Sequence, residues 1–217
     1  MAREDQEHPI QIAYGMSIVT RVKRPIKTMK RYLRQWFADA ETKRSRRRIR
    51  RLRKVPGVDI HRSVELGSLS EIIIKHPIAG LSLGKNMSCR KFCNFLMYEN
   101  ARLTIGENVF FNNYCSVNCL AHIEIGANTI FGEGVKLYDH NHAYDRSENK
   151  INVHRDKFTS SAIVIGKNCW IASNVTILKG VTIGDNVIIG ANCLIHTSIP
   201  SNAVVRLDQR LTVESRT

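Results

Sequence analysis

The sequence has no apolar run close to the roughly 18 residues that a membrane-spanning helix needs, and no signal peptide ahead of a small-residue cleavage site. Hydrophobic residues make up 43% of the 217 residues and charged residues 24%, which is ordinary for a soluble globular protein. This composition implies neither a disordered tail nor a membrane-spanning protein. The length allows one core with an appendage but not two large domains, and we expect a cytoplasmic protein.

The six cysteines lack the spacing of a common zinc site. Cys89 and Cys93 are separated by three residues rather than two, and so are Cys115 and Cys119. Because cytoplasmic thiols stay reduced, we predict that all six cysteines are buried and free, and that the protein binds no metal.

Acidic residues are scarce in one segment, and this segment accounts for the formal net charge of +14. Residues 21–54 hold 16 Lys and Arg against only Asp39 and Glu41, whereas the rest of the chain carries 17 basic and 17 acidic groups. The body of the protein is therefore neutral, and residues 1–57 are predicted to form a basic helical extension. Apolar residues recur in it at helical three- and four-residue steps, at Ile18, Val22, Ile26, Met29, Leu33, Trp36 and Phe37.

Three roles compete for the basic segment at residues 15–57. Its cations could dock on the anionic inner face of a membrane and bring the protein, as a peripheral protein, to a lipid-linked substrate. It could also cap the open end of a repeat fold and cover the exposed backbone edge, and these two roles are compatible. Nucleic-acid binding is the least favoured role, because no recognition motif accompanies the charge. Residues 43–54 are predicted to be too highly charged to pack.

A six-residue period dominates the C-terminal half of the sequence. A helix does not repeat every six residues, whereas a short strand followed by a turn residue that tolerates positive φ does. Three such units close one triangular coil, and stacked coils bury the repeating residues, which predicts an all-β parallel β-helix of hexapeptide repeats. The repeating residues are Ile165, Ile171, Ile177, Ile183, Ile189 and Ile195, and the turn residues three positions after the first five of them are Asn168, Asn174, Gly180, Asn186 and Asn192.

The same period returns upstream in shorter blocks. It is clear at Ile105, Phe111 and Val117 and again, after a two-residue slip, at Ile125, Phe131 and Leu137. Weaker signs of it lie at Leu66, Leu83, Cys89 and Phe95. We therefore place the coils at residues 58–205, with irregular early coils, and a C-terminal tail at residues 206–217.

The period stops after Leu137 and resumes near residue 163. The polar stretch at residues 139–162 holds three of the eight histidines, His140, His142 and His154. A regular stack that tolerates such an excursion commonly places its function there. We predict that residues 139–162 form an active-site loop.

The sequence resembles the hexapeptide-repeat acyltransferases, which are left-handed parallel β-helices. The resemblance rests on the Asn-His-x-x-Asp element at residues 141–145 and on the stretch CWIASNVTILKGVTIGDNVIIGAN at residues 169–192. It covers about residues 103–205 and points to the branch of galactoside, maltose, streptogramin and polysaccharide O-acetyltransferases. It implies a left-handed helix, a homotrimer, and acetyl-CoA bound along the helix wall between adjacent subunits. The handedness comes from this resemblance and not from the period.

The resemblance also implies roles for single residues. His142 is the general base that takes the proton of an acceptor hydroxyl, and the backbone N–H of Ser173 stabilises the oxyanion. The family usually ends in a Gly-x-Pro-Ala-Lys-like segment, and this chain instead ends in AVVRLDQRLTVESRT, where Arg206 and Arg210 could approach the coenzyme A phosphates. The other cofactor-side residues are Trp170 and Ala191, and the acceptor-side residues are Asn112, His140 and Asp145.

The expected reaction is direct O-acetyl transfer from acetyl-CoA to a sugar hydroxyl of a surface polysaccharide, a lipopolysaccharide or a lipid-linked precursor. The alternatives are amino-sugar N-acetylation and a non-catalytic trimeric scaffold with membrane- or nucleic-acid-binding arms. γ-Class carbonic anhydrases resemble this fold but need two histidines separated by four residues, which this sequence lacks. His140 is the rival to His142 as base, and Asp139, Asp145 or a backbone carbonyl could hold the tautomer of His142. His154 is expected to be a structural or surface residue.

Overall fold

The computed structural model describes residues 40–208 and residue 212, which lie almost wholly in the compact unit that begins at Glu41. The apolar residues predicted to form a helix between Ile18 and Phe37 lie outside the described residues, and so does Arg210. The described part of the chain contains no helix with the length and apolar character that crossing a bilayer requires.

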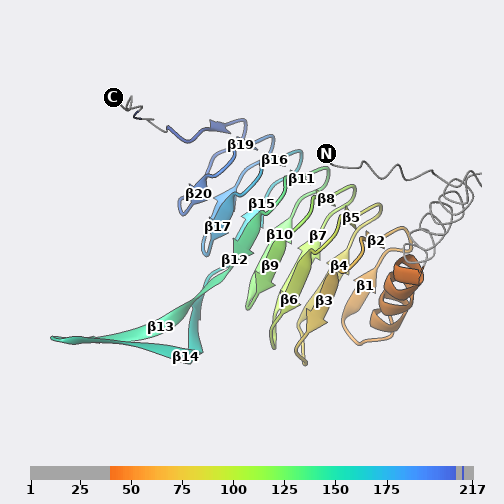
Figure 1. Cartoon of the computed structure of the whole chain (residues 1–217), viewed down its shortest axis with the longest axis horizontal. Helices are drawn as coiled ribbons and strands as arrows, with labels where there is room; N and C mark the ends of the chain where they lie inside the picture. The colour runs from red at the N-terminus through yellow and green to blue at the C-terminus, as the bar shows by residue number, and fades with distance from the viewer. Residues whose placement is uncertain (1–39, 209–211, 213–217) are drawn as a thin grey trace, which may run out of the picture. The chain divides into compact units, whose positions relative to one another are not determined.

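The chain winds into a parallel β-helix whose coils each contribute one strand to each of three sheets (Figure 1). Strands that stack on one another in a sheet are three elements apart in sequence. The exceptions are the coil that contains the hairpin and the last coil, in which strands are missing. The first sheet, sheet A, consists of β1 (Val58–Ile60), β4 (Gly80–Leu83), β7 (Arg102–Ile105), β10 (His122–Ile125), β15 (Ile163–Ile165) and β18 (Thr182–Ile183).

The other two faces have the same parallel arrangement. Sheet B consists of β2 (Glu65–Leu66), β5 (Ser88–Cys89), β8 (Phe110–Phe111), β11 (Ile130–Phe131), β16 (Trp170–Ile171), β19 (Ile188–Ile189) and β21 (Val204–Val205). Sheet C consists of β3 (Glu71–Ile74), β6 (Asn94–Met97), β9 (Ser116–Cys119), β12 (Lys136–Tyr138), β17 (Thr176–Leu178) and β20 (Leu194–Ile195). The three sheets therefore enclose one continuous interior, as the six-residue period predicts.

The interior is lined by the residues that the period singles out. All six repeating isoleucines from Ile165 to Ile195 are buried, with exposures of 5% or less, and the upstream positions from Leu66 to Leu137 are buried as well. Phe111 stacks on Phe131 with ring centroids 4.4 Å apart. All six cysteines are buried and free, which confirms the prediction for them.

The turns between the strands have the conformation that the six-residue pattern predicts. Each predicted turn residue has a positive φ, from 57° at Asn186 to 80° at Gly180. Asparagine tolerates this conformation better than other residues with a side chain. Between sheets A and B the asparagines also bond to one another through their side-chain amides, at 2.9 to 3.2 Å, from Asn86 through Asn108, Asn128, Asn168 and Asn186 to Asn202.

Coil length explains why the period is weaker upstream. Ile165 stacks on Ile183, and the coil between them is three hexapeptides long. Ile105 stacks on Ile125, and Ile60 stacks on Leu83, so the earlier coils are longer than three hexapeptides. The additional residues lengthen the connections while the inward-facing positions stay in register, so the early coils keep the core but lose the six-residue spacing.

Residues 40–52 are helical, and they pack against the first coil. Ile49 is 4% exposed and belongs to the core. Ser45 Oγ donates to the Leu66 carbonyl at 3.0 Å, and Arg53 donates through Nε to the Ile60 carbonyl at 2.9 Å. The expectation that residues 43–54 are too charged to pack was therefore wrong, because their cations lie on the helix surface or bond to carbonyls of the first coil. For this part of the basic segment the geometry is that of an end cap.

Candidate active site

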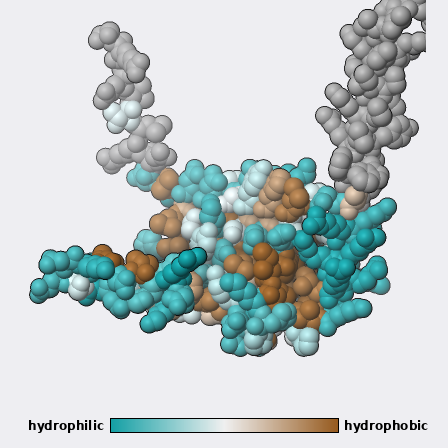
Figure 2. All heavy atoms as spheres, turned by 60° about the horizontal axis from the view of Figure 1, so that its bottom comes forward, coloured by the Kyte–Doolittle hydropathy of each residue, from teal (hydrophilic) through white to brown (hydrophobic). Residues whose placement is uncertain are grey.

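The predicted active-site loop is an antiparallel hairpin that projects from the stack of coils (Figure 1). Its strands are β13 (His140–Ser147) and β14 (Lys150–Ser160), and it is inserted where the chain passes from β12 of sheet C to β15 of sheet A. The register shifts between His142 and Tyr144, so the hairpin bends at the Asn-His-x-x-Asp element. Figure 2 shows that hydrophobic side chains lie along the mostly hydrophilic hairpin, where Tyr144, Ile151 and Val153 are exposed.

Asp139 anchors the base of this hairpin. Its side chain is fully buried and accepts the backbone N–H groups of Leu120, Ala121 and His122 at 2.7 to 2.9 Å. A carboxylate is well suited to this place because its two oxygens can accept several hydrogen bonds at once. The same side chain also contacts Nδ1 of His140 at 3.0 Å. Asp139 therefore holds His140 and not His142.

His142 is held by a backbone carbonyl, which was one of the three alternatives that the sequence left open. Its Nδ1 lies 2.9 Å from the carbonyl oxygen of His154. Because a carbonyl oxygen can only accept, the hydrogen bond requires the proton on Nδ1 and leaves the lone pair of a neutral imidazole on Nε2. The ring packs at 4.7 Å from that of Phe158 and the residue is exposed. Nε2 of His142 can thus act as a base toward a group that approaches from solvent.

His154 has a part that the sequence did not indicate. Besides the carbonyl that holds His142, its Nε2 lies 2.7 Å from Oδ2 of Asp145. Asp145, which the resemblance assigns to the acceptor side, thus also orients His154. The expected structural role of His154 thus takes a definite form, as a support for His142. Its place depends on the bulge in the hairpin, and no spacing in the sequence reveals that bulge.

His140 is less suited to be the base. Its side chain is 12% exposed and its Nδ1 faces buried Asp139. The ring lies edge-on to Tyr98 at 5.6 Å and to Phe158 at 5.3 Å. These contacts fix His140 as a support beneath the hairpin, and they favour His142 over its rival.

The other predicted site residues lie together on sheet B and on the turns that leave it toward sheet C. Trp170 is 52% exposed on the outer face of sheet B, between Ile130 and Ile188 of the neighbouring strands. The remaining members of this group follow the ends of successive sheet B strands. They are Asn112 after β8, Ser173 after β16, Ala191 after β19 and Arg206 after β21.

The backbone N–H of Ser173 is available for a ligand. The N–H groups on either side, of Ala172 and Asn174, donate at 2.8 Å to the carbonyls of Ile189 and Glu133. Among the described residues, the Ser173 N–H has no acceptor. A fixed donor of this kind can stabilise negative charge that develops on an oxygen.

One chain does not bring the two groups together. The His142 group lies at the corner between sheets C and A, whereas Ser173 lies at the corner between sheets B and C. These are different edges of one triangular prism. A site that uses both residues therefore needs edges from two chains.

The Cys119 thiol, which neighbours Asp139, is not a candidate nucleophile. Burial, and then the charge of the neighbouring Asp139 carboxylate, raise the pKa of the Cys119 thiol. Cys119 Sγ donates to the Arg102 carbonyl at 3.2 Å. The thiol thus stays protonated, and thiolate chemistry beside the hairpin is disfavoured. Within residues 40–208, no three His, Cys, Asp or Glu side chains are grouped as metal ligands would be.

Comparison with known proteins agrees with this architecture. Residues 162–197 match the family "Bacterial transferase hexapeptide (six repeats)". The chain is 31% identical over 130 residues to WbbJ of Escherichia coli, which is named for O-acetyl transfer in lipopolysaccharide biosynthesis; the match covers 58% of this chain and 66% of WbbJ. It is 29% identical over 137 residues to WcaF of Escherichia coli, named for a colanic acid biosynthesis acetyltransferase, covering 63% and 70%. The chain thus spans about two thirds of these relatives.

The fold is also found in solved structures. A mutant of AntD, an N-acyltransferase from Bacillus cereus in complex with dTDP-4-amino-4,6-dideoxyglucose and coenzyme A, has a TM-score of 0.57 at 19% identity. The match covers 77% of this chain and 89% of that chain, and at this identity it concerns the fold alone. The three-sided stack of coils, its six-residue spacing and these matches together confirm the resemblance of the chain to the bacterial hexapeptide-repeat transferases.

Proposed function

We propose that this protein is an acetyl-CoA-dependent O-acetyltransferase that acts on a sugar hydroxyl of a surface polysaccharide, a lipopolysaccharide or a lipid-linked precursor. The observation that carries the proposal is the hydrogen bond from His142 Nδ1 to the His154 carbonyl, which leaves Nε2 free and exposed as a base. The names of the relatives WbbJ and WcaF support an acetyl group as the group transferred and a glycan as its acceptor. Acetyl-CoA as donor suits a cytoplasmic protein.

The active protein is a homotrimer in this proposal. The hairpin corner with His142 and the sheet B edge with Ser173 belong to different corners of one chain, so each site combines edges of two subunits. A closed ring of three subunits makes three such sites. The exposed apolar side chains Tyr144, Ile151 and Val153 of the hairpin support this assembly, since a neighbouring subunit would cover them.

The reaction is direct transfer. Nε2 of His142 takes the proton of the acceptor hydroxyl as its oxygen attacks the thioester carbon. The carbonyl oxygen becomes an oxyanion that accepts the free N–H of Ser173 of the adjacent subunit. The tetrahedral intermediate then expels the coenzyme A thiolate, which takes the proton from the His142 imidazolium. The sugar acetate and coenzyme A leave, and His142 returns to its neutral form.

The cofactor lies along sheet B in this proposal. Exposed Trp170 offers an indole face beside the reaction centre, Ala191 lies one coil further, and Arg206 ends the same edge. Arg206 is exposed and follows directly after β21, where its cation can reach a phosphate of coenzyme A. Asn112 lies on the same edge, two coils before Ser173, on the side left for the acceptor.

The test is release of coenzyme A thiol from acetyl-CoA in the presence of sugars, amino sugars and short polysaccharide fragments. We expect turnover with hydroxyl acceptors that His142→Ala abolishes. Turnover with amine acceptors alone would show that the protein is an N-acetyltransferase instead. The pH profile separates the two further, because a hydroxyl depends steeply on neutral His142, whereas an amine can arrive already deprotonated.

A non-catalytic scaffold is tested by ligand binding. A ligand that binds only the native state raises the melting temperature. We expect coenzyme A to do so for the wild-type chain and for His142→Ala alike, since His142 acts on the acceptor. No thermal shift and no turnover with any acceptor would contradict the proposal and favour the scaffold.

A further inference from the structure

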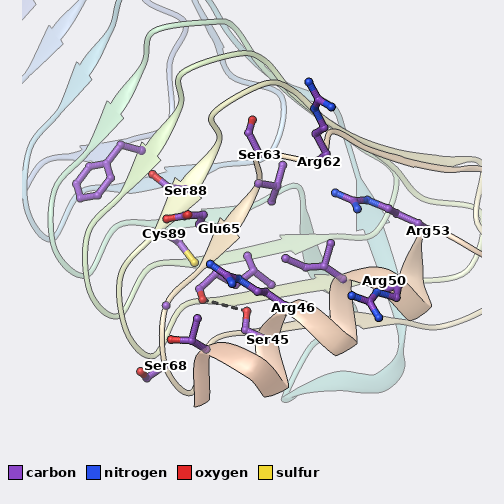
Figure 3. A pocket seen from close by; sticks show the side chains of 16 residues that line it. Ser45, Arg46, Arg50, Arg53, Arg62, Ser63, Glu65, Ser68, Ser88 and Cys89 are labelled. Atoms are coloured by element: carbon purple, nitrogen blue, oxygen red, sulfur yellow. Dashed lines mark hydrogen bonds between the residues drawn. The ribbon is translucent and has the colours of Figure 1, made fainter. Parts of the chain in front are cut away.

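A polar cavity lies at the first coils, away from the hairpin, between the helix of residues 40–52 and sheet B (Figure 3). Its volume is about 730 Å³, which is the size of a pocket for an organic ligand. It shares no residue with the His142 group or with the Ser173 group. Its polar lining consists of Arg46, Arg50, Arg53, Arg62, Ser45, Ser63, Ser68, Ser88, Thr42 and Glu65.

The lining carries an excess of positive charge. Four arginines face one acid, Glu65. Arg53 is held by the first coil, because its Nε and Nη2 donate to the carbonyls of Ile60 and His61. Within the described residues, Arg46, Arg50 and Arg62 have no acidic partner. Three guanidinium groups are therefore free to bind an anion.

Helix geometry directs these cations to the cavity. Arg46 and Arg50 are four residues apart and lie on the same face of the helix. Arg47 and Arg51 are exposed on the same helix but do not line the cavity. On the opposite wall, Figure 3 shows Arg62, Ser63 and Ser88 from the coils. The hydroxyl of Ser88 has no partner among the residues that the structure describes, so it can also bond to a ligand.

We propose that this cavity binds the phosphate or diphosphate group of a phosphorylated ligand through Arg46, Arg50 and Arg62. Arginine suits phosphate because its planar fork donates two parallel hydrogen bonds to two oxygens. Several guanidinium groups around one cavity suit a group with two or more negative charges better than a single carboxylate. The remaining volume, beside the ring of Phe110, leaves room for the organic part of the ligand.

The first experiment titrates the full chain with pyrophosphate in a calorimeter at about 0.15 M salt. We expect Arg46→Gln/Arg50→Gln to weaken binding at least tenfold. The matched control, Arg47→Gln/Arg51→Gln, removes the same charge from the same helix outside the cavity, and we expect it to change the affinity less than threefold. Arg62→Gln, from the opposite wall, is expected to weaken binding as well, and the melting temperature of each variant shows that it is folded.

The second experiment distinguishes the sources of the phosphate. The chain is sedimented with vesicles of phosphatidylcholine alone and with vesicles that also contain anionic phosphatidylglycerol. Binding to the anionic vesicles that pyrophosphate competes away, and that Arg46→Gln/Arg50→Gln loses, identifies a lipid phosphate. Binding of pyrophosphate without such vesicle binding identifies a soluble phosphorylated ligand. Either outcome supports the cavity as a phosphate site.

Two results would overturn the proposal. One is that pyrophosphate does not bind to the folded wild-type chain. The other is that both double variants weaken binding equally, because general attraction by a basic surface would then explain it. Neither measurement uses acetyl-CoA or an acceptor, so a failure here is distinct from a failure of the proposed acetyl transfer.

Discussion

Two corners of the same prism show how a repeat fold separates stability from chemistry. At the corner between sheets A and B, every coil from the second onward turns through an asparagine of positive φ, and these asparagines bond to one another along the stack. At the corner between sheets C and A, the chain leaves the stack for the hairpin of β13 and β14. Ile125 and Ile165 still stack on each other, although the whole hairpin lies between them in the sequence.

The difference lies in where the polar groups bond. At the asparagine corner, each side-chain amide bonds to its equivalent in the next coil, so one residue type serves every coil from the second onward. At the hairpin corner, buried Asp139 accepts three backbone N–H groups and the His154 carbonyl holds His142. The asparagine corner repeats the same bond and stabilises the stack of coils. The hairpin corner occurs once and leaves Nε2 of the His142 imidazole available. Four changes test this contrast.

His142→Ala should have the largest effect. Removing a general base lowers transfer about 10²–10⁴-fold, while loss of an exposed side chain should change the free energy of unfolding by less than about 0.5 kcal/mol. Thiol release and urea unfolding measure the two. His154→Ala is the control, because it keeps the carbonyl that holds His142 and should lose less activity. Retention of more than about a hundredth of the wild-type rate by His142→Ala would place the base elsewhere.

Ser173→Pro tests the backbone N–H at the remaining corner, between sheets B and C, because proline has no N–H. Proline suits this position because Asn174, the next residue, has a φ of 59°, as in a type II turn. We expect transfer to fall about 10²–10³-fold, the loss typical of one oxyanion donor. Ala127→Pro, at the equivalent turn position of the asparagine corner, is the control and should retain activity. If the two variants behaved alike, the Ser173 N–H would have no special part.

Asp139→Asn should destabilise the base of the hairpin. The amide has one acceptor oxygen in place of two, so at least one of the buried N–H groups of Leu120, Ala121 and His122 loses its partner. An unsatisfied buried group costs about 1–3 kcal/mol in the free energy of unfolding, which urea denaturation measures. Asp185→Asn changes a half-buried carboxylate near the asparagine corner that accepts one backbone N–H, of Lys167, which the amide oxygen can still accept, so it should cost less. Equal urea midpoints for the two variants would argue against the anchor.

Asn168→Ala should have the smallest effect, and it should affect stability alone. It removes two amide bonds of the asparagine corner and leaves a residue with a φ of 58° that alanine adopts with strain of about 1 kcal/mol. Asn168→Gly removes the same bonds without the strain and should be the more stable of the two in thermal unfolding. Greater stability of the alanine variant, or a loss of acetyl transfer in either, would break the separation between the corners.

Much of the fold could be predicted because the period is a local property. The isoleucines from Ile165 onward and the turn asparagines follow directly from six-residue spacing, and the structure confirms them. The early coils were only hinted at, since additional residues in their connections conceal the spacing. The packing of residues 43–54 was predicted wrongly. Their composition suggests repulsion, but Ile49 and the carbonyls of the first coil provide contacts that composition does not reveal.

The candidate site was also predictable only in part. The sequence by itself determined the β-helix, the place where its period is interrupted, and His142 as the candidate base, because periodicity and a short motif can be recognised along the chain. Only the tertiary structure decided which nitrogen of His142 is free, what His154 and Asp139 hold, and that Ser173 lies at a different corner. The first two depend on hydrogen bonds between residues that are distant in sequence or displaced by a bulge, and the third depends on how the coils wind; all of these exist only after the coils have stacked and the hairpin has paired.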